Sequence, residues 1–280
     1  MQPTLAREAF HRPGWIYEEK YDGWRMVALK DGAHVRLISR QGVDHTERFR
    51  ELADAVASLK APRLILDGEV CVFDKNLVSQ FHLLGGSESA ELCPPPVFMA
   101  FDCLHVHGLD VRGLPLHRRR AMLEQEIADA RMIHAARRLP ENGLAAWAVV
   151  KERGYEGLVA KDDQSLYRGG PTRSWIKCKI RREGRFVVGG ILGLPSTFAG
   201  ILIGERRGRR LVFRGTIEWG LGLRTAKALL SQGRERSSSP FRDVRFSRGV
   251  TWLEPTITVE VTYSELMEGR LRDPVYRGIV

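Results

Sequence analysis

The pattern of the sequence changes at residues 181–185, RREGR, and this change constrains the fold more than any other feature. Before it, apolar strand-like runs alternate with amphipathic helical stretches, as in a mixed α/β domain. After it come strand-like runs separated by Gly-rich turns, with one short helical stretch at 224–230. We therefore predict a hinge at 181–185 and two domains, residues 1–183 and 184–280.

The first domain is expected to combine a hairpin, buried strands and three helices. Asp31-Gly32 lies between two β-rich runs and predicts a hairpin turn. A helix over 47–59 would place four apolar side chains on one face, and Gly154 is a predicted C-terminal stop for another helix. The four apolar side chains are Phe49, Leu52, Val56 and Leu59. The remaining predicted elements are strands at 63–74, 97–106, 156–161 and 174–180, and helices at 116–133 and 144–154.

In the second domain, about five strands and one helix fit a small Greek-key barrel of the oligonucleotide-binding (OB) kind. A small SH3-like barrel would give a similar pattern. The segment GRERSSSP at 233–240 is expected to be an exposed loop. The predicted fold class is therefore an α+β domain followed by a small all-β barrel.

The charge of the chain is uneven. The net charge is +10, from 44 basic and 34 acidic residues, and the last 100 residues hold 18 basic and 10 acidic residues, or +8 of that total. A basic C-terminal third suggests a polyanionic partner such as nucleic acid. A well-solvated protein surface is the alternative explanation.

The sequence shows no signal for export or membrane insertion. No run approaches the roughly 18–20 apolar residues that span a bilayer, and the start, MQPTLAREAF, lacks a basic region followed by an apolar stretch. We expect no membrane association and a cytosolic protein. The four cysteines, Cys71, Cys93, Cys103 and Cys178, have neither pairing nor metal spacing, so buried free thiols are expected.

The stretch EEKYDGWRM at 18–26 contains the pattern Lys-x-Asp-Gly-x-Arg, with Lys20, Asp22, Gly23 and Arg25. A surface hairpin would explain this pattern, and so would a lysine that acts as a covalent nucleophile. An amine attacks phosphorus only when it is unprotonated, and nearby cations favour that form. Arg25 and the lysines further along the chain are candidates for those cations.

Three later motifs carry charges on strand-like runs: LDGEV with Glu69, EGLVAK with Glu156 and Lys161, and WIKCK with Lys177 and Lys179. The spacing of the last two lysines sends both side chains to one face of a strand. Charges on buried strands are costly unless they are paired or liganded. Two carboxylates and three lysines in one cleft would suit a nucleoside triphosphate and Mg²⁺. Each motif alone also fits a turn, a solvated strand end or an amphipathic edge strand.

Taken in order, KYDGWR, SRQG, LDGEV, FMAFDCL, EGLVAK and WIKCK resemble the nucleotidyltransferase motifs of ATP-dependent DNA ligases. The resemblance is nearest to the ligase domain of bacterial non-homologous end-joining ligase D and its stand-alone relatives. It also covers RQGVDHTERF, LPLHRRRAML, FVVGG, WLEPTITVEV and LRDPVYRGIV, from about residue 13 to the end. It implies a nucleotidyltransferase (ATP-grasp-like, mixed α/β) domain followed by an OB-fold barrel.

The resemblance implies a role for each motif residue. Lys20 would attack the α-phosphate of ATP and become lysyl-AMP, after which the AMP would pass to the 5′-phosphate of a nick and the 3′-hydroxyl would seal the strand. Glu18 would contact adenine and Phe101 would stack on it, while Glu69 and Glu156 would bind the ribose and the metal. Arg25 and Arg40 would bind ribose, or phosphates of the nucleotide or nick, and either Arg168 or Arg173 would contact the nucleotide. Lys177 and Lys179 would stabilise charge on the α-phosphate, and Arg272 and Asp273 would orient the leaving pyrophosphate.

The implied cofactors are ATP and Mg²⁺, with Mn²⁺ as an alternative metal. The implied substrate is nicked or broken double-stranded DNA, handled by a near-minimal, monomeric bacterial ligase at the nucleoid, with an end-bridging repair protein as a candidate partner. Two other kinds of protein remain open: an RNA ligase or GTP-dependent capping-type nucleotidyltransferase, and a non-catalytic nucleic-acid-binding protein.

Overall fold

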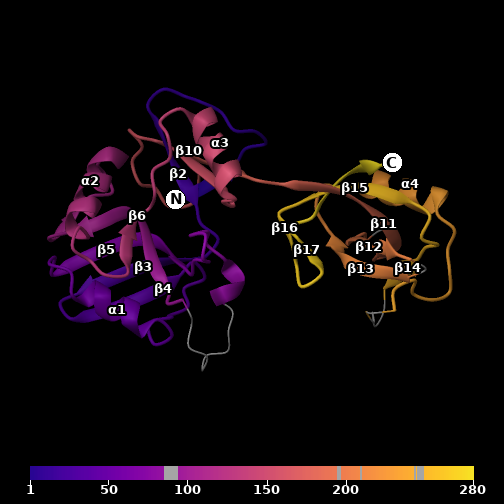
Figure 1. Ribbon diagram of the computed structural model, residues 1–280, viewed down its shortest axis with the longest axis horizontal. Helices are drawn as coiled ribbons and strands as arrows, with labels where there is room; N and C mark the ends of the chain where they lie inside the picture. The colour runs from indigo at the N-terminus through magenta and orange to yellow at the C-terminus, as the bar shows by residue number, and fades with distance from the viewer. Residues whose placement is uncertain (85–93, 194–196, 209, 243, 245–248) are drawn as a thin grey trace. The chain divides into compact units, whose positions relative to one another are not determined.

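The structure is a computed structural model that describes residues 1–84, 94–193, 197–208, 210–242, 244 and 249–280 (Figure 1). The chain forms two compact units, Met1–Ile180 and Arg181–Val280. This boundary lies three residues before the one predicted from the sequence. The first unit combines two β-sheets with α-helices, and the second is rich in strands.

The first unit contains a four-stranded sheet in the order β1-β10-β9-β2. The strands are β1 (Gln2–Leu5), β10 (Pro171–Lys179), β9 (Gly157–Asp162) and β2 (Trp15–Lys20). Helix α3 (Gly143–Arg153) packs on one face of this sheet, where Tyr17, Val150, Leu158 and Cys178 form an apolar cluster. The opposite face therefore remains available for the charged side chains of the same strands.

A second sheet in the first unit has the order β4-β3-β5-β6-β7, and β8 adds to β6 in parallel. Helix α1 contacts β3 and β4, and helix α2 contacts β6. Together they cover the main apolar core of this unit. The elements are β3 (Trp24–Asp31), β4 (His34–Ser39), α1 (Arg50–Ala57), β5 (Arg63–Cys71), the 3₁₀ turn η1 (Phe81–Leu84), β6 (Val97–Val106), β7 (Leu109–Asp110), α2 (Leu116–Glu126) and β8 (Ile133–Ala135).

Several local predictions are confirmed. Strands β3 and β4 pair on either side of Asp31-Gly32, and Phe49, Leu52, Val56 and Leu59 are all buried. Helix α3 begins at an Asn142 cap, whose side chain accepts hydrogen bonds from two backbone N–H groups, and ends at Gly154 with a φ of 73°. A left-handed residue at the end of a helix favours glycine, as predicted.

One prediction is wrong and another differs in detail. The helix expected over 116–133 ends at Glu126, because Ile133–Ala135 instead pairs in parallel with Phe98–Ala100 of β6. The hinge was predicted at 181–185, whereas the two units divide between Ile180 and Arg181, and Arg182–Arg185 already begins β11 (Arg182–Leu192), which pairs with β15 (Thr258–Tyr263). Polar residues at an exposed strand end look like a loop in sequence. Only Ile180 and Arg181 lie between β10 and β11.

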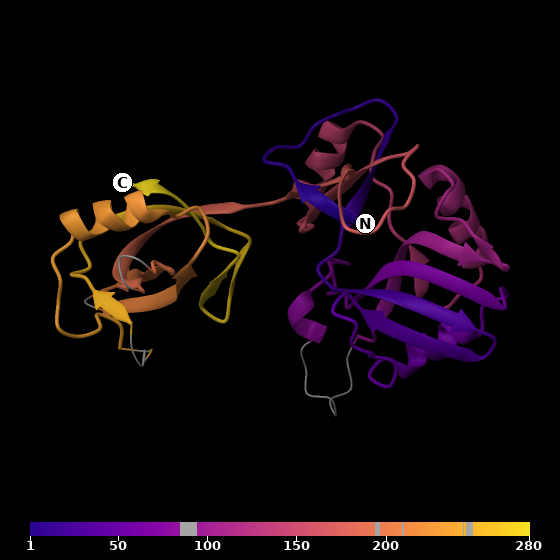
Figure 2. The same ribbon diagram turned by 180° about the vertical axis from the view of Figure 1, so that it is seen from behind.

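The second unit is an OB-type barrel with sheet order β13-β12-β11-β15-β18, to which β14 adds at β11. Figure 2 shows these strands curving round, with α4 alongside. Trp219 and Val275 form a bridge between the segment after β13 and the edge strand β18, which closes the barrel. The other elements are β12 (Gly200–Arg207), β13 (Arg210–Ile217), α4 (Leu223–Gln232), β14 (Val250–Trp252), β16 (Glu265–Met267), β17 (Arg270–Arg272) and β18 (Val275–Ile279).

Three further expectations bear on the described residues. The 233–240 segment follows α4 as a loop in which no residue is buried and half are exposed. Cys71, Cys103 and Cys178 are buried and free, as predicted, while Cys93 lies outside the described residues. Within the part of the chain that the structure describes, no helix has both the length and the apolar character needed to cross a bilayer.

Candidate active site

Lys20 lies at the end of β2, on the face of the four-stranded sheet opposite α3. Gly157 of β9 pairs with Lys20 on one side and with Lys179 of β10 on the other. In antiparallel ladders directly paired residues share a face, so the two lysine side chains project together. Gly157 cannot carry a side chain here, because a Cβ would lie 2.0 Å from the carbonyl oxygen of Cys178. The close approach of β9 and β10 therefore sets the spacing of the two lysines.

Glu156 connects these lysines. Its Oε2 accepts a hydrogen bond from Lys20 Nζ, and its Oε1 lies 2.9 Å from Lys179 Nζ. Burial, followed by the charges of Lys179 and Lys20, lowers the pKa of the neighbouring Lys177. The site therefore holds three amines around one carboxylate, which suits an incoming group with several negative charges.

Glu69 approaches from β5 of the other sheet. Its Oε1 accepts a hydrogen bond from the backbone N–H of Gly23, at 3.2 Å. Burial raises the pKa of Glu69 to about 7; the charge of Lys20 opposes this rise and that of Glu156 adds to it. Gly23 is required at this turn, since a Cβ would lie 2.4 Å from the carbonyl oxygen of Val70.

Glu69 and Glu156 were predicted to hold a metal. Burial is the main cause of the raised pKa of Glu69, and the charge of Glu156 adds to it, a repulsion of the kind that a divalent cation relieves. Carboxylate oxygens are the donors that Mg²⁺ and Mn²⁺ prefer. The described residues contain no group of three or more His, Cys, Asp or Glu side chains placed to bind a metal. The residues present therefore fit a cation that takes its other ligands from water and phosphate oxygens.

Glu18 lies two residues before Lys20 on β2, so its side chain projects to the same face of the sheet, and it is buried. Its Oε1 lies 2.8 Å from Arg120 Nη1, and its Oε2 lies 2.5 Å from Lys161 Nζ. Lys161 in turn lies over two aromatic rings, 4.7 Å from the centroid of Phe101 and 4.2 Å from that of Trp175. Both carboxylate oxygens of Glu18 are thus held by cations, beside the ring that was predicted to stack on adenine.

Arg25 and Arg40 line a separate part of the same unit, a pocket of about 230 Å³ that also includes Asp67 and Tyr167. Arg25 makes two hydrogen bonds to Asp67, of 3.0 and 2.7 Å, and the Tyr167 hydroxyl donates to the same carboxylate at 2.7 Å. The Arg25 guanidinium also lies 5.3 Å from the Phe101 ring centroid. Arg40 is exposed and donates to the Gln2 side chain at 3.3 Å.

Comparison with known proteins decides the family. Residues 3–179 match the family described as "ATP dependent DNA ligase domain", and residues 195–279 match "ATP dependent DNA ligase C terminal region". The chain belongs to the ATP-dependent DNA ligases.

Relatives within this ligase family are multifunctional non-homologous end joining proteins named LigD. The protein from Mycobacterium tuberculosis is 33% identical over 281 residues, which cover 95% of this chain and 36% of that protein. The protein from Pseudomonas aeruginosa is 32% identical, covering 99% of this chain and 35% of that protein. The chain thus spans about a third of the length of these curated relatives.

Solved structures agree with this assignment. The crystal structure of the ligase domain from M. tuberculosis LigD is 29% identical, with a TM-score of 0.58, and the match covers 99% of this chain and 94% of that one. A mycobacterial DNA ligase D complexed with ATP and MES is 30% identical, with a TM-score of 0.57 over 99% of this chain and 94% of that one. The same two-domain ligase architecture is therefore present here.

The remaining residues predicted for the nucleotide site are more dispersed. Arg173 is exposed on β10 at the strand spacing of Lys177 and Lys179, and Arg168 is exposed in the preceding loop. Arg272 and Asp273 lie in the second unit, whereas Lys20 lies in the first. Arg272 Nη1 lies 2.8 Å from Glu265 Oε1, and the Asp273 side chain accepts a hydrogen bond from Ser264, at 3.2 Å.

Sequence reasoning missed the buried arginines of α2. Arg119 makes two hydrogen bonds to Asp102, of 2.7 and 2.8 Å, and both side chains are fully buried. Arg120 holds Glu18 as described above. Three consecutive arginines in LPLHRRRAML look like a solvated helix face. The signal that could have found them is the presence of uncompensated acidic residues, Glu18 and Asp102, within buried strands.

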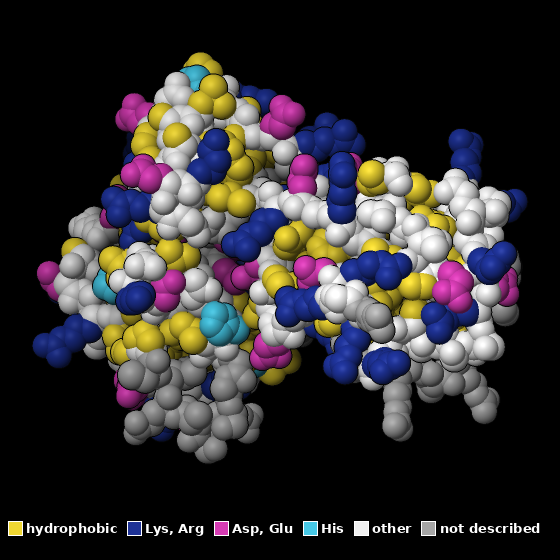
Figure 3. Space-filling model, turned by 45° about the vertical axis from the view of Figure 1, so that its right-hand side comes forward, with side chains coloured by type: hydrophobic (Ala, Val, Ile, Leu, Met, Phe, Trp, Pro, Cys, Tyr) yellow, Lys and Arg dark blue, Asp and Glu magenta, His cyan; other side chains and the backbone are white. Residues whose placement is uncertain are grey.

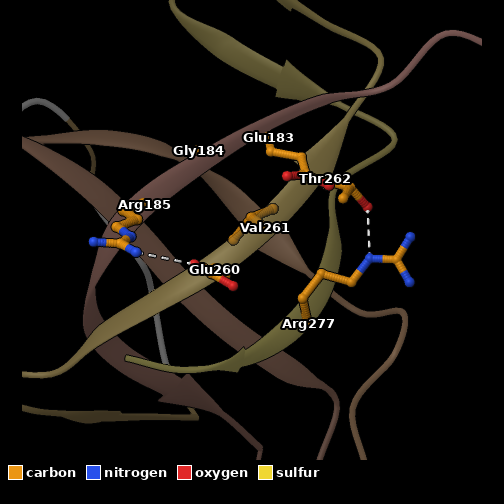
Figure 4. A pocket seen from close by; sticks show the side chains of 7 residues that line it. All are labelled: Glu183, Gly184, Arg185, Glu260, Val261, Thr262 and Arg277. Carbon is orange, nitrogen blue, oxygen red and sulfur yellow. Dashed lines mark hydrogen bonds and ion pairs between the residues drawn. The ribbon is translucent and has the colours of Figure 1, made fainter.

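The second unit carries a pocket over β11, β15 and β18, shown in Figure 4. Arg185 lies 3.3 Å from Glu260, and Arg277 donates a 3.1 Å hydrogen bond to the Thr262 hydroxyl. None of the residues predicted for the nucleotide site lines it. Because Glu183 and Glu260 balance the arginines, this pocket is less suited to phosphate than the lysine cluster of the first unit.

Proposed function

We propose that the chain is an ATP-dependent DNA ligase that seals 5′-phosphate/3′-hydroxyl nicks or ends through a lysyl-AMP intermediate on Lys20. The main observation behind this proposal is that three lysines and two carboxylates from the two sheets of the first unit lie close together. They are Lys20, Lys177, Lys179, Glu69 and Glu156. Family membership supports the same reaction class. The solved mycobacterial DNA ligase D, a relative of this chain, is complexed with ATP.

In the first step, the neutral amine of Lys20 attacks the α-phosphorus of ATP. A phosphorus–nitrogen bond forms, the bond to the pyrophosphate oxygen breaks, and the amine releases a proton. Lys177 and Lys179 would face the charge that develops on the phosphate oxygens. Glu156 holds Lys20 in place before the nucleotide arrives, which lowers the entropic cost of in-line attack.

In the later steps, a 5′-phosphate oxygen of the DNA attacks the phosphorus of lysyl-AMP and regenerates the lysine. The 3′-hydroxyl then attacks the activated 5′-phosphate, forming the phosphodiester bond and expelling AMP. Mg²⁺ or Mn²⁺, bound near Glu69 and Glu156, would supply charge neutralisation. Phe101, beside Glu18, would stack on the adenine ring.

The second unit is the proposed DNA-binding part. Figure 3 shows many basic side chains on the visible face of this unit, with acidic ones between them, and its net charge of +8 accounts for most of that of the chain. Such a surface would bind the DNA backbone in a salt-dependent manner. A monomer suffices for the reaction. We place it at the nucleoid of a bacterial cytoplasm, with an end-bridging repair protein as a candidate partner.

The test is nucleotide transfer to the protein. The purified chain is mixed with α-labelled ATP and Mg²⁺ without DNA, and covalent label is measured, with Lys20→Ala and Lys20→Arg variants beside it. We expect label from ATP in the unmodified chain, none in either variant, loss of label when nicked DNA is added, and no labelling in the presence of a metal chelator.

Two results would contradict the proposal. Labelling from α-labelled GTP instead of ATP would indicate capping-type chemistry. Normal nick sealing by Lys20→Ala, in protein shown by circular dichroism to be folded, would remove Lys20 from the mechanism.

A further inference from the structure

A second feature of the first unit lies on the α3 side of the four-stranded sheet. A pocket of about 310 Å³ forms where the segment 137–140 runs beside α3 and the turn that contains Leu77. None of the residues assigned to the nucleotide site lines it. Its walls come from three separate parts of the chain, so the fold itself maintains its shape.

The charge of this pocket is one-sided. Arg137, Arg138 and Arg153 line it, and no lining residue is acidic. Arg137 Nη1 lies 3.0 Å from Oε2 of the buried Glu19. Arg138 lies 3.3 Å from Glu124, but both side chains are about half exposed, so this pair is weak. Among the described residues Arg153 has no ion-pair partner, and it is exposed on α3.

The floor and rim of the pocket are apolar. Leu139 and Val149 contribute to its lining, and Leu77 stands at the rim with 61% of its surface exposed. Leu77 has a φ of 59°, which is unusual for a residue with a branched side chain. Its turn is nevertheless fixed, because Asp74 accepts hydrogen bonds from the backbone N–H groups of Asn76, Leu77 and Val78. The exposed side chain of Leu77 is therefore fixed in place at the edge of a basic pocket.

We propose that this pocket docks an acidic segment of a partner protein that carries one apolar anchor side chain between its carboxylates. Arginine forks bind carboxylates in a bidentate manner, and the apolar floor with Leu77 would bury the anchor. A DNA backbone fits less well, because it offers no apolar group for the floor. The proposal concerns a different surface from the proposed ligase site and does not depend on it.

The test measures binding of a short fluorescein-labelled peptide of Asp and Glu with one central Leu, by fluorescence anisotropy. We expect saturable binding to the full chain, weakened at least about tenfold by Arg153→Glu and by Leu77→Ser. The control is Arg118→Glu, the same charge reversal on α2 away from the pocket, and it should bind the peptide as the unmodified chain does. A peptide with Ser in place of Leu should bind more weakly.

Each of the following results would overturn the proposal. Equal weakening by Arg118→Glu would indicate unspecific attraction to a basic protein. Absence of saturable binding would remove the site. Displacement of the peptide by a short DNA duplex whose own affinity falls in Arg153→Glu would make the pocket a nucleic-acid surface. All three exposed substitutions should leave adenylylation unchanged, so failure here is distinguishable from failure of the ligase proposal.

Discussion

Replacement of Gly157 by alanine tests whether strand spacing sets the geometry of the lysine cluster. The added Cβ would lie 2.0 Å from the Cys178 carbonyl oxygen, whereas ordinary contact begins near 3.4 Å, so β9 and β10 must separate by about 1.4 Å. Such overpacking costs about 1–3 kcal/mol of stability. A displacement of about 1 Å at a reacting group costs about 10²-fold in rate. Since Gly157 lies between Lys20 and Lys179, we expect Gly157→Ala to slow adenylylation by about 10²-fold.

The assay is single-turnover transfer of α-labelled AMP to the protein, normalised to the folded fraction from chemical denaturation. Gly113→Ala is the matched control, because a Cβ there meets no atom within 4 Å and its backbone needs no left-handed conformation. It should leave both rate and stability unchanged. A Gly157→Ala variant with the rate of the unmodified chain would refute the reasoning, because the two lysines would then tolerate a wider separation of their strands.

Two further predictions concern buried charges. Burial raises the pKa of the Glu19 carboxyl to about 7 from an ordinary value of 4.5, although Arg137 opposes this. The neutral form therefore favours the folded state, and the unfolding free energy should fall as the pH rises from about 4.5 to about 7. Glu19→Gln should remove roughly 3 kcal/mol of that dependence in urea titrations, and an unchanged slope would contradict it. Arg119→Met should cost about 3–5 kcal/mol, because Asp102 keeps a buried charge without its partner. In the same titrations, the double variant Arg119→Met with Asp102→Asn should lose less unfolding free energy than Arg119→Met alone. Equal losses in the two variants would count against the cost assigned to an unpaired Asp102 charge.

Local periodicity and turn chemistry were enough to predict much of the fold. The apolar spacing from Phe49 to Leu59 and the stop at Gly154 depend on neighbours in sequence, and the structure contains both. The long helix was wrong beyond Glu126 because Ile133–Ala135 finds a partner in β6, which no local pattern reveals. Likewise, the polar start of β11 is a strand only because β15 lies beside it.

Part of the candidate site could be predicted from the sequence, because side chains alternate between the two faces of a strand. Lys177 and Lys179 share a face through simple alternation, and Glu156 joins Lys179 to Lys20. What the sequence could not supply was the choice of ion-pair partner. Glu18 is held by Arg120, more than 100 residues away in the chain. Such a pairing depends on the packing of α2 against the sheets and leaves no periodic signal.

The short connection between the units has a mechanical consequence. The backbone N–H of Ile180 donates a 2.9 Å hydrogen bond to the carbonyl oxygen of Glu156, the residue whose side chain holds both Lys20 and Lys179. Lys179 is itself the next residue back along the chain. A displacement of the chain at Ile180 would therefore strain the backbone of Glu156, whose carboxylate holds both lysines.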